Sequence, residues 1–271
     1  MRKRFIHKLR SDRYEFAPNR RTPAKLPFQV VTFAGKGSFP EVVAMLDSFY
    51  SNAGDPRSCR VISDGTLTEA DGCVLAKIHA KISILSLDQF LTRPLPPCLA
   101  NKLEEHPLMK KLGALIETAR LENGFYIDSD VLFFSEAREF DWSSLVSEPG
   151  PRYMQDVAFT LDPRLLNEAE KSAPNNANSG LVLFNHPADL APYAARLRDL
   201  GEQWPNHFSE QTIVHLALSD LDATPLDPKI FVLAFDDQFW FRDKYAYCGK
   251  AVCRHYTTPI RHKFWIQTFF H

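Results

Sequence analysis

Two aspartates separated by one residue interrupt an apolar stretch near the middle of the chain. Asp128 and Asp130 stand between residues 125–127 and 131–134, which are aromatic or branched apolar residues. Short runs of this composition favour β-strands, and a carboxylate placed between them needs a partner or a cation. Carboxylates at positions i and i+2 of a bend can both reach one hard metal ion. The pattern indicates either a metal site at a strand end or a strand end whose acids face water.

The elements that would position these acids follow a regular alternation in the first half of the chain. Strands are predicted at 28–33, 60–63, 81–85 and 125–127, with helices at 40–52, 66–80 and 107–121 between them. This order is typical of an α/β fold with a mostly parallel sheet covered by helices on both faces. Ligands of such sheets bind at the carboxyl ends of the strands. Thr32 to Ala34, Asp64 and Asp128 to Asp130 all occupy such ends.

The second half of the chain is less regular. Residues 157–160 are a candidate strand, and 174–180 form a predicted loop of turn-forming residues that runs into a strand at 181–185. Helices are predicted at 188–202 and from Ser209 to Ala217, and a further strand at 230–235. No internal repeat is present, so we expect a single domain over residues 27–271, preceded by a basic leader at 1–26.

Composition restricts the function classes. The hydrophobic share of 45% and the net charge of −1 are those of an ordinary globular protein, and they give no reason to expect a nucleic-acid partner. The 5 cysteines contain no Cys-x-x-Cys pair, which argues against a zinc ribbon or a disulfide scaffold. No apolar run approaches the roughly 20 residues that cross a bilayer, and no signal peptide is recognisable. We expect a cytoplasmic protein that contacts membranes at most peripherally, through its basic N-terminus.

Three segments in a fixed order carry a resemblance to a known family. They are residues 126–133 (Tyr-Ile-Asp-Ser-Asp-Val-Leu-Phe), residues 178–185 (Asn-Ser-Gly-Leu-Val-Leu-Phe-Asn) and the late His255. Together they resemble the GT-A-type nucleotide-sugar glycosyltransferases, in particular the glycogenin-like and lipopolysaccharide galactosyltransferase-like branch, over residues 27–265. The resemblance implies a divalent ion, Mn²⁺ or Mg²⁺, held by Asp128, Asp130 and His255 against the diphosphate of a sugar donor. Such an ion neutralises the developing charge of the leaving diphosphate.

The same resemblance implies where the donor, most commonly a UDP-hexose, would lie. Thr32, Phe33 and Ala34 would hold the base and ribose, and Asp64 would accept from the nucleobase. Lys110 or Lys111 would reach the donor, Ser129 belongs to the donor-binding motif, and Asn178, Ser179 and Gly180 would line the sugar and acceptor pocket. The family's glycine and Lys-Pro-Trp after the histidine are altered here, so either Arg261 or Lys263 would be the phosphate cation.

The resemblance also suggests the groups that would act on the sugar. Glu210 and Gln211 would lie beneath the donor sugar and stabilise an oxocarbenium-like transition state in a retaining enzyme. In an inverting enzyme, Glu210 or Asp156 would deprotonate the acceptor hydroxyl. The acceptor would be a glycan, a lipid-linked sugar or another hydroxyl compound.

Two other functions fit part of the sequence. An apolar strand followed by Asp-Ser-Asp-Val also resembles haloacid-dehalogenase-type phosphatases, in which Asp128 would be the nucleophile, Asp130 the general acid, and Asp236 and Asp237 the magnesium ligands. That motif normally occupies the first strand of its domain, whereas three strand-helix units precede it here. A sugar-nucleotide-binding protein that has lost catalysis would explain the altered C-terminal motif.

Overall fold

The computed structural model describes residues 24–104, 106–172 and 176–270. Most of the predicted basic leader, residues 1–23, therefore lies outside the described residues. At the start of the described part, Lys25 forms a β-bridge and an ion pair with Asp55, and Leu26 is buried in the core. The domain boundaries stay a prediction.

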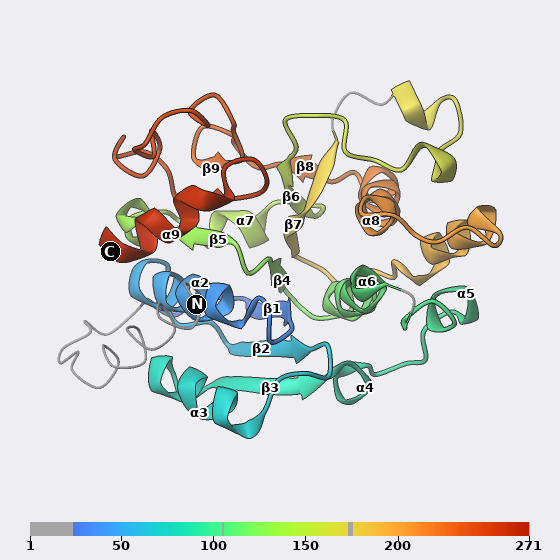
Figure 1. The fold of residues 1–271 in the computed structure, drawn as a ribbon, viewed down its shortest axis with the longest axis horizontal. Coiled ribbons are helices and arrows are strands. Elements are labelled where there is room, and N and C mark those ends of the chain that lie inside the picture. The colour runs from blue at the N-terminus through green and yellow to red at the C-terminus, as the bar shows by residue number, and fades with distance from the viewer. Residues whose placement is uncertain (1–23, 105, 173–175, 271) are drawn as a thin grey trace.

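A seven-stranded sheet forms the centre of the fold, in the order β3-β2-β1-β4-β7-β6-β8. Strands β3, β2, β1 and β4 are parallel, β7 is antiparallel to both of its neighbours, and β8 is parallel to β6. Figure 1 shows this order from bottom to top. The bounds are β1 Gln29–Ala34, β2 Ser58–Ser63, β3 Ile82–Ser86, β4 Gly124–Ile127, β6 Arg152–Gln155, β7 Ala177–Phe184 and β8 Thr224–Pro225. The predicted α/β fold with a mostly parallel sheet is confirmed.

Helices cover both faces of this sheet because neighbouring strand residues point to opposite sides. Val30 and Phe125 pack with α2 (Phe39–Asn52) and α3 (Glu69–Ile78) in one core, whereas Val31 and Tyr126 belong to a second core on the other face. The second core includes α4 (Leu87–Phe90), α6 (Pro107–Ala119), α8 (Ser209–Asp220) and the 3-10 helix η4 (Ala191–Leu200). In Figure 1, α2 and α3 lie to the left and α6 and α8 to the right. Each fully buried Leu, Ile, Val or Phe contributes about 1.5–3 kcal/mol.

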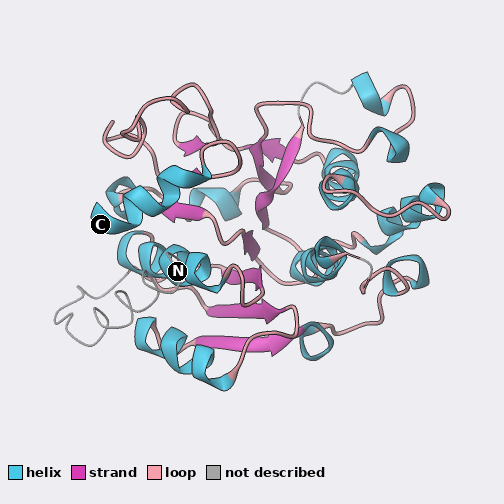
Figure 2. Ribbon diagram, viewed as in Figure 1, coloured by secondary structure: helices cyan, strands magenta, loops and turns pink. Residues whose placement is uncertain are grey.

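A small second sheet turns the chain back towards the acidic motif. It has the order β5-β10-β9, with β5 at Val131–Phe133, β9 at Phe231–Val232 and β10 at Cys253–His255. Strand β10 is antiparallel to β5 and places His255 opposite Val131. The helix α9 (Arg261–Phe270) follows, beside the loop between β9 and β10 (Figures 1 and 2). Shorter helices join the remaining elements: α5 Pro97–Ala100, α7 Ser144–Ser147, η1 Ser135–Arg138, η2 Pro163–Leu165 and η3 Glu170–Ser172.

Several predicted elements of the second half differ from the structure. The helix predicted at 188–202 is the 3-10 helix η4, and only Phe231–Val232 of the strand predicted at 230–235 form a strand, β9. Residues 157–160 are not a strand, because the Asp156 carboxylate accepts from the backbone of Val157 and Ala158 and from the Thr160 hydroxyl, which holds the segment in a turn. The strand there is β6, which comes just before this turn.

The Asn-Ser-Gly segment was predicted as a loop but belongs to a strand. Strand β7 begins at Ala177, because Ala177 and Asn178 pair with the end of β6. The carbonyl of Gly180 also accepts from the amide of Asp128, at 2.7 Å. Pairing on both sides fixes the segment next to the acidic motif.

Within the described residues, no helix is both long and apolar enough to cross a bilayer. The cytoplasmic location stays a prediction.

Candidate active site

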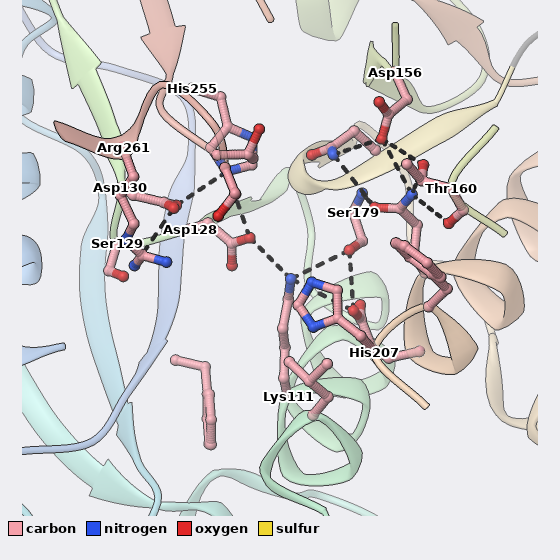
Figure 3. Close-up of a pocket in the computed structure, with 18 of the residues that line it drawn as sticks. Lys111, Asp128, Ser129, Asp130, Asp156, Thr160, Ser179, His207, His255 and Arg261 are labelled. Carbon is pink, nitrogen blue, oxygen red and sulfur yellow. Dashed lines mark hydrogen bonds and ion pairs between the residues drawn. The ribbon is translucent and has the colours of Figure 1, made fainter. Parts of the chain in front are cut away.

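A cavity of about 460 Å³ lies at the carboxyl ends of the parallel strands. Its walls come from segments far apart in the sequence: the end of β1, the turn after β4, the start of β7, the first turn of α8, and the chain from β10 into α9. In Figure 3 the two aspartates and His255 face one side of this space, and Asp156 and Thr160 lie on the other. Lys111 rises from α6 between the two groups.

Asp128, Asp130 and His255 form one cluster on the cavity wall. Their ligand atoms all lie within 4.8 Å of one another. The Nε2 atom of His255 is 3.0 Å from Asp130 Oδ1 and 3.9 Å from Asp128 Oδ2. The pairing of β10 with β5 brings the histidine there, and the Tyr256 amide donates to the Asp130 carbonyl at 2.9 Å. The three residues predicted as metal ligands from the sequence are therefore brought together.

Gly180 gives this cluster its space. A β-carbon on Gly180 would lie 2.2 Å from Cε1 of His255 and 2.7 Å from Oδ2 of Asp128. Any side chain there would push two of the three groups aside. Two carboxylates and one imidazole suit Mn²⁺ or Mg²⁺ better than a soft metal. The donor set and the close approach of Gly180 therefore fit a divalent cation.

Charges within the cluster favour the ionised forms. Burial alone would raise the pKa of Asp130, but His255 and Arg261 outweigh it and hold that pKa below its ordinary value. Burial would also lower the pKa of His255, but Asp130 outweighs it and raises the pKa. A carboxylate that stays ionised is a ready ligand for a cation.

Lys111 is a second positive centre, adjacent to the metal cluster. Its Nζ is 2.9 Å from Asp128 Oδ2, 3.2 Å from Ser179 Oγ and 3.5 Å from Glu210 Oε2. Burial would lower the pKa of Lys111, but Asp128 and Glu210 outweigh it and hold the pKa above its ordinary value. The lysine thus stays charged while almost completely buried. On the other side of Asp128, the Tyr126 hydroxyl donates to Oδ1 at 2.9 Å.

The two carboxylate oxygens of Glu210 differ in their hydrogen bonds. Ser179 donates to its Oε2 at 3.1 Å, whereas its buried Oε1 has no hydrogen-bond partner within the described part of the chain. Burial holds the pKa of Glu210 above its ordinary value, although Lys111 opposes this shift. Glu210 lines the cavity, and this oxygen has the capacity to accept one more hydrogen bond.

Asp156 organises the opposite wall of the cavity. One carboxylate oxygen, Oδ2, accepts from Thr160 Oγ1 at 2.7 Å, Asn178 Nδ2 at 3.0 Å and Gln211 Nε2 at 3.2 Å. Its other oxygen accepts from the backbone of Val157 and Ala158. With both oxygens occupied, Asp156 is arranged to fix Gln211 and Asn178 rather than to accept a proton from a ligand.

The structure separates the paired alternatives for the predicted cations. Arg261 lines the cavity with its guanidinium 3.5 Å from Asp130, whereas Lys263 is fully buried and donates to Asp237 at 2.8 Å. Lys111 lines the cavity, whereas Lys110 contacts Glu104 and the Asp64 carbonyl outside it. Lys263 and Lys110 are therefore not placed to hold a ligand in this cavity.

The other residues predicted to bind the donor also differ in whether they line the cavity. Phe33 and Ser129 line the cavity. Thr32 and Ala34 are buried within β1, and the hydroxyl of Thr32 has no partner within the described residues. Asp64 accepts from the amide and hydroxyl of Thr66 and does not line this cavity.

Several lining residues were not foreseen from the sequence: Leu108, Thr160, His207, Phe208, Phe235, Thr257 and Thr258. Thr257 and Thr258 follow His255 closely in the sequence, and this position could have identified them as residues of the site. His207 and Phe208 precede the helix that carries Glu210, but no motif marks them. Tyr126 was a missed neighbour, although residues i and i+2 of a strand share one face.

The acids required by the phosphatase hypothesis do not meet. Asp237 is fully buried between Arg254 and Lys263, and Asp236 contacts Lys244 and Tyr245. Neither lines the cavity that holds Asp128 and Asp130. Asp236 and Asp237, which that hypothesis needs as magnesium ligands, therefore bind other residues outside the cavity.

Comparison with known proteins finds similarity in structure alone. No protein-family model matches the sequence, and no curated protein matches it. The galactosyltransferase LgtC in complex with donor and acceptor sugar analogues aligns at a TM-score of 0.58 and 12% identity, over 90% of this chain and 96% of that one. The apo structure of the bifunctional glycosyltransferase WbbM aligns at 0.53 and 14%, over 90% of this chain, which spans only 50% of WbbM. The apo form of the glycosyltransferase GlyE of Streptococcus pneumoniae TIGR4 aligns at 0.51 and 11%, over 89% of this chain and 60% of that one.

Proposed function

Because the chain has the GT-A fold of these glycosyltransferases, we propose that it transfers a sugar from a nucleotide-diphosphate donor to a hydroxyl acceptor. One observation carries this proposal: Asp128, Asp130 and His255 form a metal-type cluster on the wall of a cavity at the strand ends. The likeness to known structures supports the fold, and the cluster supports the chemistry. A hexose carried by UDP is the proposed donor, and Mn²⁺, with Mg²⁺ as the substitute, is the proposed ion.

Asp128, Asp130 and His255 would hold the ion, with Asp130 as the more deeply buried carboxylate. When bound, a divalent ion supplies Lewis-acid stabilisation to a leaving diphosphate. Arg261, about half exposed at the cavity mouth, adds a guanidinium that suits phosphate oxygens. The metal cluster and the arginine together define the end of the cavity where the diphosphate would bind.

Glu210 and Gln211 lie on the sugar side of the proposed site. The unpartnered Oε1 of Glu210 is proposed to accept a hydrogen bond from a hydroxyl of the donor sugar. The other carboxylate oxygen, Oε2, lies near Lys111, which also contacts Asp128. Gln211 is held by Thr160 and Asp156, with its Nε2 donating to the Thr160 hydroxyl at 2.6 Å. A side chain fixed in this way can stabilise developing charge without reorganising during the reaction.

The proposed acceptor is a glycan, a lipid-linked sugar or another hydroxyl compound that enters from the wall containing His207 and Phe208. A catalytically inactive sugar-nucleotide-binding protein would share the donor site. It would differ in releasing no nucleoside diphosphate.

Donor turnover tests the proposal directly. The purified protein is incubated with Mn²⁺ and a panel of nucleotide sugars, and release of nucleoside diphosphate is followed with and without EDTA. We expect slow metal-dependent release with at least one donor, and near-complete loss in Asp130→Ala, because removing a metal ligand costs several kcal/mol of transition-state stabilisation.

Asp236→Asn is the matched control, since it removes an acid that contacts Lys244 away from the cavity. This variant should keep the wild-type rate. Metal-dependent donor binding without any turnover would support the inactive binding protein instead. Donor binding that survives the combined Asp128→Ala and Asp130→Ala change would refute the proposed site.

A further inference from the structure

The loop between β9 and β10 exposes an unusual group of aromatic side chains. We define residues 236–250 as the aromatic loop; it lies beside α9 at the upper left of Figure 1. Three consecutive side chains are mostly exposed, Phe239 at 90%, Trp240 at 59% and Phe241 at 76%, and Tyr247 is 61% exposed. Single exposed apolar residues are common, but a contiguous group marks an interaction surface.

A buried ion-pair network fixes both ends of this aromatic group. Arg254 is completely buried, and its guanidinium donates to Asp237 at 2.7 and 3.0 Å and also to Asp243. Asp237 further accepts from Lys263 of α9 and from the Lys244 amide. Residues 239–241 therefore lie between two anchored positions, 237 and 243. The aromatic side chains are presented by a rigid base.

The charges around the group have one predominant sign. Arg242, Lys244 and Lys250 are exposed in the loop, against one exposed carboxylate, Asp236. Aromatic residues bordered by cations are typical of segments that bind at the interface of an anionic bilayer.

We propose that the aromatic loop inserts Phe239, Trp240 and Phe241 into the interface of an anionic membrane. The loop is also connected to the cavity, because Phe235 and Arg261 line the cavity on either side of the same network. Phe235 and Arg261 each stand two residues before a member of the network, Asp237 and Lys263. If the proposed transferase function holds, membrane binding through the loop would favour a lipid-linked hydroxyl acceptor over a soluble one, because enzyme and acceptor would then be held at the same surface.

Vesicle binding tests the loop without any nucleotide sugar, so its result is independent of the transferase proposal. The full chain is sedimented with vesicles of phosphatidylcholine containing phosphatidylglycerol, and with phosphatidylcholine alone. We expect binding to the anionic vesicles, and a loss of about tenfold or more when Phe239, Trp240 and Phe241 are all replaced by Ser, because each exposed ring contributes apolar burial. Trp204→Ser, which removes a 65% exposed aromatic outside the loop, should bind as the wild type does.

Tryptophan quenching by brominated lipids places the contact at one residue. Trp240→Phe keeps an apolar ring and should retain vesicle binding but lose most of the quenching, whereas Trp204→Phe should retain both. Unchanged far-ultraviolet circular dichroism would show that the variants remain folded.

Three results would overturn the proposal. The first is failure of the wild type to bind anionic vesicles. The second is unchanged binding by the triple Ser variant, which would assign the contact to the basic leader. The third is concentration-dependent self-association that the triple variant abolishes in the absence of vesicle binding, which would assign the loop to contact between two copies.

Discussion

A single glycine decides whether the three proposed metal ligands can meet. Gly180 lies on β7, where its missing side chain leaves room for the ring of His255 and the carboxylate of Asp128. Replacing it with Ala places a methyl group 2.2 Å from His255 Cε1, well inside van der Waals contact. We predict that Gly180→Ala weakens Mn²⁺ binding by about 10- to 100-fold, as mutations that displace metal ligands do. Titration of free Mn²⁺ by electron paramagnetic resonance measures this change.

Gly37→Ala provides the comparison, because a β-carbon there meets nothing within 4 Å. This variant should bind Mn²⁺ as the wild type does. Wild-type affinity in a folded Gly180→Ala protein would show that the ion binds elsewhere or that the cluster does not hold one.

The sequence identifies the acidic residues of the site better than its cations. Asp128 and Asp130 are recognisable because acids between two buried strands are rare and their spacing fits one ion. Lys110 and Lys111 could have been separated by helical phase, because Lys111 stands three residues after Leu108 and four before Leu115, next to the apolar face of the helix, whereas Lys110 does not. The packing of α6 against the sheet then brings Lys111 to Asp128, a contact that helical phase alone does not predict. Arg261 and Lys263 differ for the same reason, because the start of α9 directs Arg261 to the cavity and Lys263 into the core.

At the scale of elements, a buried network joins β10 to α9 and to the aromatic loop. Asp237 accepts from Arg254 and Lys263, and all three side chains are fully buried. His255 is the next residue after Arg254, so the network also holds the strand that carries the proposed metal ligand. We predict that Asp237→Asn destabilises the fold by about 3 kcal/mol at pH 7, because it leaves positive charge buried and uncompensated. Urea unfolding measures the difference.

Acid should reduce the effect of this substitution. Burial alone would raise the pKa of Asp237, but Arg254 and Lys263 outweigh it and hold the pKa well below its ordinary value. The stabilisation from this carboxylate is therefore complete above its unfolded pKa of about 4 and is lost as the pH falls towards the folded pKa. The wild-type advantage should stay constant from pH 7 to about pH 5 and shrink as the pH falls below about 4. Asp236→Asn, which affects a surface ion pair with Lys244 and a hydrogen bond from the Tyr245 hydroxyl, should cost about 0–1 kcal/mol. An equal cost for both variants would contradict the role of the network.

The alternation of elements, rather than any motif, made the first half of the fold predictable. Strands β1 to β4 are apolar runs separated by amphipathic helices, and such runs have few other ways to bury themselves. The second half was less predictable because its local signals conflict with tertiary pairing. Asn178 to Gly180 are turn-forming residues, yet pairing with β6 and contact with Asp128 place them in β7. Likewise, the predicted strand at 157–160 is a turn because Asp156 takes up its backbone donors.

At the scale of the whole molecule, the proposed ion should stabilise the fold, because its three ligands come from two distant parts of the chain. Asp128 and Asp130 follow β4 of the central sheet, whereas His255 ends β10 of the small sheet. A ligand that binds only the folded state at about 100 times its dissociation constant adds about 2.7 kcal/mol of stability. For a chain of this size, that corresponds to a rise of about 5 °C in melting temperature.

Calorimetry with and without Mn²⁺ measures this shift, and EDTA should reverse it. The decisive comparison is His255→Ala against His262→Ala. His262 is exposed on α9, and its ring nitrogen contacts only the Pro259 carbonyl among the described residues. We expect the Mn²⁺-dependent rise to disappear in His255→Ala and to persist in His262→Ala. An undiminished rise in His255→Ala would mean that the aspartates alone hold the ion. The metal would then not couple the two sheets, because His255 is the proposed ligand that β10 supplies.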